Sequence, residues 1–367
     1  ADFTFDPGVL DTLFTSLAPA PTAEAPAAPE TPAAIGGDLF ASAADLLAKG
    51  FFERAQSEAQ RAITRGGDRI RGGTLLGDVF AKRLLWGEAL ERYRDVRREA
   101  PNHLGAMLGE ATALLRLGRA LEARQVAENL LVRAPENVDT LLLVAAVRGD
   151  AGDADGALAA LETARRLAPT RPDVLRHIGD ITHKLRNVDE AIAAYRSALQ
   201  LDPLYAVARF QLASVLMERD LWHDAERELL LALDAVPTYA DATLSLSRLL
   251  RRVGRPNDAM PLLIDLLQRD LYHFDALIAL GETLLERGEK QDAMIAFARV
   301  LRFDPTHAGA LYHEGGILAE QHRYREAVDR FQQVIDVAPS SEYARRARRE
   351  IRSATDLGRR FARQAAS

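Results

Sequence analysis

Small and apolar residues recur along this chain at intervals of 34 positions. The pattern in residues 293–331 predicts three helices separated by two turns. Phe297 and Phe331 stand 34 residues apart, and so do Gly281 and Gly315. An alanine occupies every step of the same interval: Ala55, Ala89, Ala123, Ala157, Ala191, Ala225, Ala259, Ala293 and Ala327. Self-similarity at this period is typical of helical repeats stacked in a row.

This interval predicts nine repeats in residues 36–341, which begin at positions 36, 70, 104, 138, 172, 206, 240, 274 and 308. The eighth position of each repeat is small, so the two helices of a repeat can approach closely: Ala43, Gly77, Ala111, Ala145, Gly179, Ala213, Ser247, Gly281 and Gly315. A proline ends the second helix in seven of the nine repeats, because its ring and its missing N–H group stop a helix. Gly67 and Leu271 take its place in the other two, where we expect looser or displaced turns.

These positions resemble the tetratricopeptide-repeat pattern across residues 36–341. The resemblance implies an all-α fold, in which nine antiparallel helix pairs of 34 residues form a right-handed superhelical solenoid. It also implies that the first helix of each pair lines a concave groove. The resemblance is specific for the fold and says little about activity.

Two ligand-binding patterns of that family are missing from this chain. The lysines and asparagines that clamp chaperone tails are replaced at the matching positions by Phe40, Ala44, Thr74, Asp78, Leu108 and Thr112. The asparagine ladder that holds extended peptides is also absent from the sequence. We therefore expect this chain to bind neither chaperone tails nor extended peptides by these two patterns.

Residues 1–17 predict a separate amphipathic helix. Asp6 and Pro7 are suited to its N-cap and first position. Apolar residues then recur on one face, which is typical of a helix that docks in a groove. The predicted docking residues are Phe5, Leu10, Leu13, Phe14 and Leu17. We expect residues 3–17 to serve self-association, to bind another subunit or to plug this chain's own groove; the alternatives are a frayed terminus or an extra helix packed on the first repeat.

Residues 18–35 predict a tether, because five prolines interrupt an alanine-rich sequence. An extended, semi-stiff segment of this length could reach about 55 Å. The tether could therefore carry the first helix along the solenoid or to a neighbouring molecule.

Residues 342–367 predict a basic capping helix and tail. Tyr343, Ala347 and Ile351 are spaced to pack on the last repeat, and a solenoid needs a polar-backed helix to cover its open end. Eight arginines stand against three acidic residues in this segment, which gives it a charge of +5 and leaves −11 for the rest of the chain.

Composition excludes several kinds of chemical site and of membrane segment. The chain has no cysteine, which excludes disulfides, thiol nucleophiles and thiolate metal sites. No apolar run approaches the roughly 18 residues of a membrane span, and the first residues lack the basic region of a signal peptide. The sequence mildly favours a cytoplasmic protein and leaves a periplasmic one open. Since the chain begins with Ala1 and not methionine, we expect that residues upstream of it were removed.

The sequence contains no phosphate-binding loop, no zinc-protease motif and no nucleophile-elbow motif, so we predict no enzyme, no cofactor and no small-molecule substrate. One cluster nevertheless has the residue types of a metal site, because His177, Asp180 and His183 recur along one predicted helix. The two histidines align poorly, and Arg176 and Lys184 oppose a cation. We therefore predict a polar patch of the groove and no metal.

The predicted groove changes in character along the chain. Its first repeats are apolar, its middle is polar, and arginines near position 248 are placed to meet acidic residues of a ligand. An alternative for each leucine is that it belongs to the core between repeats. The predicted groove residues are Phe40, Leu47, Leu75, Leu108, Leu142, Leu143, Arg176, His177, Asp180, Phe210, Gln211, Arg248 and Arg252.

These patterns predict a non-catalytic scaffold or adaptor that binds protein or peptide segments in its groove and helps to assemble a multiprotein complex. The alternative is a protein that binds nucleic acid or an anionic membrane surface through its arginine-rich tail. The tail carries only Tyr343 and Phe361 as aromatic residues, and the rest of the chain is acidic, so the sequence favours the scaffold.

Overall fold

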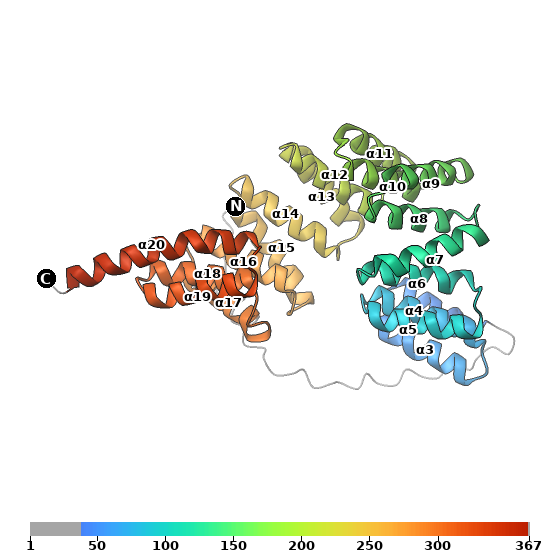
Figure 1. The fold of residues 1–367 in the computed structure, drawn as a ribbon, viewed down its shortest axis with the longest axis horizontal. Helices are drawn as coiled ribbons and strands as arrows, with labels where there is room; N and C mark the ends of the chain where they lie inside the picture. Colours follow the sequence, from blue (N-terminus) through green and yellow to red (C-terminus); the bar gives the residue numbers. More distant parts are fainter. Residues whose placement is uncertain (1–37, 366–367) are drawn as a thin grey trace. The chain divides into compact units, whose positions relative to one another are not determined.

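The computed structural model describes residues 38–365, with side chains up to residue 357, and this part is helical throughout its regular structure (Figure 1). None of its helices is long and apolar enough to cross a membrane. The helices are α2 (Ala41–Ala48), α3 (Phe52–Thr64), α4 (Arg69–Lys82), α5 (Trp86–Glu99), α6 (Leu104–Arg116), α7 (Ala120–Arg133), α8 (Val138–Asp150), α9 (Ala154–Leu167), α10 (Pro172–Lys184), α11 (Val188–Leu201), α12 (Ala206–Glu218), α13 (Trp222–Ala235), α14 (Ala240–Arg252), α15 (Pro256–Arg269), α16 (Phe274–Glu286), α17 (Lys290–Phe303), α18 (Ala308–Glu320), α19 (Tyr324–Val337) and α20 (Glu342–Ala365).

First and second helices alternate along the described chain. The second helices begin at residues 52, 86, 120, 154, 188, 222, 256, 290 and 324, which keeps the interval of 34 residues. Each of the pairs α4 with α5, α10 with α11 and α18 with α19 is in extensive contact, and successive first helices, such as α6 and α8, also touch. The predicted all-α class of stacked helix pairs is confirmed, while the count of nine repeats and the domain bounds stay predictions.

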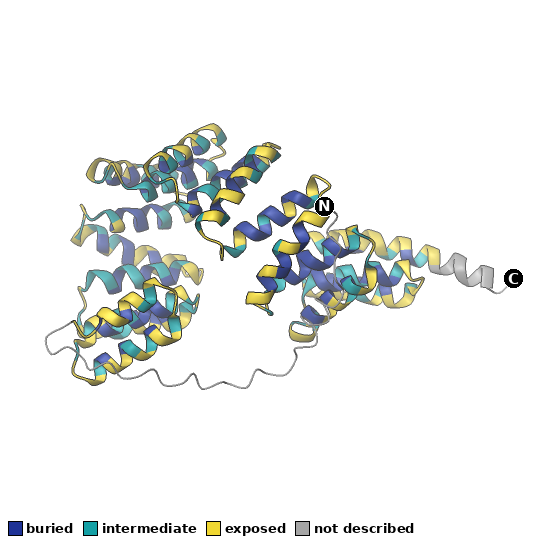
Figure 2. Cartoon of the chain, turned by 180° about the vertical axis from the view of Figure 1, so that it is seen from behind, coloured by how far each residue is buried: buried dark blue, intermediate teal, exposed yellow. Residues whose placement is uncertain are grey.

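The described residues form two compact units, divided inside α12. We call residues 38–215 the N-terminal unit and residues 216–365 the C-terminal unit. Each unit has its own core, and in each the buried residues follow the helix sides that face neighbouring helices (Figure 2).

Glycines in the first helices pack against aromatic rings of the second helices. A Cβ atom added to Gly281 would lie 2.5 Å from the ring of Phe297, which is fully buried. The same contact recurs in three other pairs: Gly77 with Tyr93, Gly179 with Tyr195 and Gly315 with Phe331. The small eighth position predicted from sequence thus makes room for one large ring in each of these pairs.

Two adjacent glycines of α18 give a matched test of this packing. A Cβ at Gly315 would lie 2.8 Å from the Phe331 ring, whereas a Cβ at Gly316 would meet no atom within 4 Å. We expect Gly315→Ala to lower the free energy of unfolding by about 1–3 kcal/mol through overpacking. Gly316→Ala should raise it by up to about 1 kcal/mol, because alanine favours a helix over glycine. Chemical denaturation of both variants measures the difference, and equal effects would contradict the packing argument.

The two turns that lack a proline, at Gly67 and Leu271, differ from each other in the structure. At Gly67 the turn differs from the others, as predicted: Gly66 has a φ of +89°, and the Gly67 N–H group donates to the Ala62 carbonyl at 2.9 Å. At Leu271 the prediction was wrong. The His273 N–H group donates to the Asp270 carbonyl at 3.2 Å, the same turn bond that follows the second helices that end in proline. This backbone bond forms the turn there without a proline.

Helix α20 packs against both α18 and α19. Its Ala344 and Ala347 are fully buried, and Tyr343 and Ile351 contact the cluster around Phe331. The helix extends well beyond this contact, to Ala365.

Residues 1–17 and 18–35, including Phe5, Leu10, Leu13, Phe14 and Leu17, lie outside the described residues.

Candidate functional site

Charged side chains on successive first helices pair with one another inside each unit. We call the surface formed by the first helices of one unit its first-helix face. In the N-terminal unit, Lys184 of α10 pairs with Asp150 of α8, and Arg171 pairs with Asp139 at 2.8 Å. These pairs join neighbouring repeats along that face.

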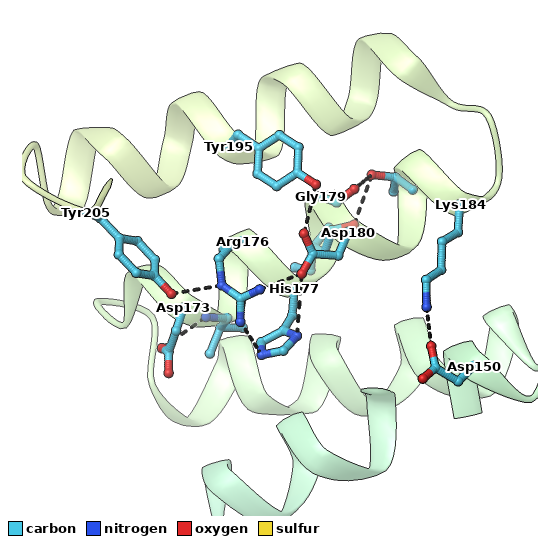
Figure 3. A network of polar contacts seen from close by, with 12 residues as sticks. Asp150, Asp173, Arg176, His177, Gly179, Asp180, Lys184, Tyr195 and Tyr205 are labelled. Atoms are coloured by element: carbon cyan, nitrogen blue, oxygen red, sulfur yellow. Dashed lines mark hydrogen bonds and ion pairs between the residues drawn. The ribbon is translucent and has the colours of Figure 1, made fainter. Parts of the chain in front are cut away.

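A connected polar group on the N-terminal unit is centred on Arg176 (Figure 3). Its Nε group donates to the Tyr205 hydroxyl at 2.8 Å, and its Nη1 group donates to Asp180 Oδ2 at 2.5 Å. Its Nη2 group lies 2.5 Å from His177 Nε2. The Tyr195 hydroxyl donates to the other oxygen of Asp180 at 2.8 Å. We call these five residues the Arg176 cluster.

Burial and the charge of Arg176 set the protonation state of His177 in this cluster. Burial, reinforced by the positive charge of Arg176, lowers the pKa of His177 to about 3, so the ring is neutral at neutral pH. Its Nε2 atom can therefore accept the hydrogen bond from Arg176. Burial raises the pKa of Asp180, although Arg176 and Tyr195 both act against that rise.

The same contacts argue against a metal at this place. Arg176 occupies the His177 nitrogen and one Asp180 oxygen that a cation would need, and it brings a positive charge of its own. Between residues 38 and 357 no group of three or more histidine or acidic side chains is arranged to hold a metal ion. Of the predicted polar patch, Arg176, His177 and Asp180 thus contact one another, whereas Lys184 pairs with Asp150.

A second group lies on the first-helix face of the C-terminal unit. Arg251 of α14 donates to Glu282 at 2.6 Å and to Glu286 at 2.7 Å, both on α16. The His313 ring on α18 lies 2.9 Å from the other oxygen of Glu282 and stacks on Phe297 with a centroid distance of 4.9 Å. We call Arg251, Glu282, Glu286 and His313 the Arg251 cluster.

Glu282 is the electrostatic centre of this cluster. Burial favours its neutral form, but the hydrogen bond with His313 and the charge of Arg251 outweigh burial and lower the pKa of Glu282 to about 2. The carboxylate therefore stays ionised above that pH and links three consecutive first helices. Helical spacing alone places these charges on one face but does not show how they pair. The sequence signal that could have suggested the pairing is the separation of the opposite charges by 31 and 35 residues.

Arg248 and Arg252 differ from their neighbour Arg251. Both are exposed on α14, and neither makes an ion pair or hydrogen bond with any side chain of residues 38–357. The Arg252 guanidinium lies over the Trp222 ring at 5.5 Å, which orients it without neutralising its charge. Within residues 38–357, no carboxylate neutralises the charge of either predicted arginine.

The predicted apolar residues divide into two sets. Phe40 is 3% exposed, and Leu142 and Leu143 are each 8% exposed. Phe40 fills the space beside Gly67 and Gly72, while both leucines belong to the main core of the N-terminal unit. For these three residues the structure corrects the prediction, because they are core residues. The half-buried set that keeps some accessible surface is Leu47, Leu75, Leu108, Phe210 and Gln211.

Comparison with solved structures shows the fold. The human IFIT1 dimer with m7Gppp-AAAA is similar over 81% of this chain and 80% of its own, with 15% identity and a TM-score of 0.54. PilF of Pseudomonas aeruginosa is similar over 58% of this chain and 97% of its own, with 16% identity and a TM-score of 0.50. YrrB, a TPR protein with an unusual peptide-binding site, covers 52% of this chain and 97% of its own at 23% identity and a TM-score of 0.42. A comparison with curated protein sequences found no match.

A family model identifies the repeats directly. The tetratricopeptide-repeat model matches residues 74–138, 145–206 and 244–308, which together make up just over half of the chain. Each matched stretch contains helices whose 34-residue interval and glycine–ring packing are described above. This chain therefore belongs to the tetratricopeptide-repeat family.

Proposed function

We propose that this protein is a non-catalytic scaffold that binds segments of partner proteins on its first-helix faces and helps to assemble a multiprotein complex. Tetratricopeptide repeats generally mediate protein–protein interactions, and this chain consists largely of such repeats. The particular ligand and the assembly are our proposal. It rests on the chemistry of the exposed side chains.

One observation carries the proposal furthest: among the described residues, Arg248 and Arg252 are exposed and make no ion pair. Arg251, between them, is held by Glu282 and Glu286. An exposed positive charge next to a neutralised network can attract an acidic segment and orient it on the helix. We infer that the C-terminal unit binds an acidic protein segment at Arg248 and Arg252.

The way in which the two clusters use their polar atoms supports the non-catalytic part of the proposal. Asp180 and His177 are bonded to Arg176, and Glu282 is bonded to Arg251 and His313. A general base needs a free lone pair directed at a substrate proton. These groups direct theirs at neighbouring side chains, so they stabilise the surface on which a partner docks.

The test is a peptide-binding measurement on the full chain. Short acidic, neutral and basic peptides are compared by fluorescence anisotropy, and we expect the acidic class to bind. The double variant Arg248→Glu with Arg252→Glu should raise the Kd of such a peptide about ten-fold or more, because it turns attraction into repulsion.

The matched control is Arg302→Glu with Arg325→Glu. Both arginines are exposed in the same unit but lie on the second helices α17 and α19. The control makes the same change in charge and should leave the Kd unchanged. Equal weakening by both variants would reduce the effect to net charge, and an unchanged Kd in the first variant would overturn the proposed site. If the chain turns over a substrate, and if removal of either cluster abolishes that turnover, the non-catalytic assignment is overturned.

A further inference from the structure

Several exposed arginines of this chain have an acidic partner three or four residues away on the same helix. Examples are Arg98 with Asp95, Arg165 with Glu162 and Arg323 with Glu326. Such pairs offset the repulsion between like charges along a helix. A row of arginines without such partners keeps this repulsion uncompensated.

Helix α20 carries such a row. Arg345, Arg349 and Arg352 are exposed, follow one another at spacings of four and three residues and make no ion pair within the described residues. Residues at these spacings lie on one face of a helix. In contrast, Arg346 pairs with Glu342 at 2.5 Å, and Arg348 donates to the Pro339 carbonyl at 3.0 Å. We call Arg345, Arg349 and Arg352 the arginine row.

The surface at the beginning of the row is hollowed. Glu342, Arg345, Arg346 and Arg349 line this depression. Three of its four residues are cationic, and the partner of Arg346 is the single carboxylate in it. A carboxylate from another segment would meet two unpaired guanidinium groups there, and guanidinium is well suited to bind carboxylate.

The chain itself contains a segment of the complementary charge. Residues 1–35 hold five acidic residues, Asp2, Asp6, Asp11, Glu24 and Glu30, and no lysine or arginine. The first 17 of these residues have the apolar spacing of a docking helix, and the proline-rich remainder could span about 55 Å. An acidic docking segment on a long tether and an unpaired basic row thus occur in one polypeptide.

We propose that the arginine row of α20 binds the acidic N-terminal segment, residues 1–17, of a second copy of this chain. Reciprocal exchange of the two segments would give two identical contacts and so a closed dimer. Attraction between opposite charges at an exposed surface is screened by salt, so the dimer should be sensitive to ionic strength. This association uses residues of α20, whereas the proposed ligand site uses Arg248 and Arg252 of α14.

The experiment is multi-angle light scattering of the full chain over a range of concentrations, with circular dichroism to verify folding. We expect a dimer in about 50 mM salt and an at least ten-fold larger dissociation constant in about 500 mM salt. Arg345→Glu with Arg349→Glu should weaken the dimer by about ten-fold or more in low salt, and Asp2→Arg with Asp11→Arg should do the same. The four substitutions together should restore the dimer, because the opposite charges face each other again.

The matched control is Arg124→Glu with Arg133→Glu, two exposed arginines of α7 that change the net charge equally. It should leave the dimer intact. The proposal is overturned by a monomer at every concentration in low salt, by a dimer that survives Arg345→Glu with Arg349→Glu, or by a four-fold variant that stays monomeric. Salt-sensitive binding of single-stranded DNA that needs the arginine row, together with an unchanged mass, would assign the row to nucleic acid instead.

Discussion

Phe297→Ala is expected to lower the free energy of unfolding of the C-terminal unit by about 3–5 kcal/mol, the usual cost of removing a fully buried phenylalanine. The ring is 0% exposed and lies against Gly281, whose missing side chain leaves nothing to fill the space. It also supports the stacked ring of His313, which in turn reaches Glu282. The substitution should therefore loosen the Arg251 cluster as well as the core.

Urea denaturation followed by circular dichroism measures this loss, with unfolding of each unit analysed separately because repeat arrays can unfold in steps. Phe303→Ala is the matched control on the same helix, since Phe303 is 45% exposed and contacts only the rings of Tyr272 and Phe274 among the described aromatic residues. The control should cost less than about 1.5 kcal/mol. Similar losses in both variants would show that the glycine–ring contact does not dominate the stability of this pair.

Acidification from about pH 7 to pH 5 is expected to destabilise the N-terminal unit by about 2 kcal/mol through His177. The pKa of His177 is about 3 in the folded chain, below the ordinary histidine pKa of 6.5, because the ring is largely buried and lies against Arg176. Between these two values the unfolded chain binds a proton that the folded chain does not. The contribution of His177 to stability is therefore complete above about pH 6.5 and falls as the pH drops toward 3.

His177→Gln should remove this part of the pH dependence, because glutamine does not titrate yet can still accept a hydrogen bond from Arg176. Asp180 and Asp173 also lie close to His177, so the comparison of variant and wild type at each pH isolates the histidine. The control is His223→Gln, since His223 is exposed on α13. Thermal melts from pH 7 to pH 5 provide the data, and parallel curves for wild type and His177→Gln would refute a neutral, buried His177.

The candidate sites were only partly predictable. Helical spacing by itself places Arg176, His177 and Asp180 on one face, because residues three and four apart on a helix are neighbours. Spacing could not reveal that the Tyr205 hydroxyl, 29 residues away, accepts a hydrogen bond from Arg176. It also could not separate Leu142 and Leu143, which are core, from Leu108, which keeps some exposed surface.

By itself the sequence determined the helices, their 34-residue interval and the close packing of each pair, because these depend on local propensity and on the size of side chains at fixed repeat positions. Only the tertiary structure decided which charges remain available. Arg248, Arg251 and Arg252 lie within one and a half turns of the same helix, yet Arg251 alone meets carboxylates of the next first helix. Pairing across helices depends on where two backbones place their side chains in space, and a one-dimensional pattern does not contain that distance.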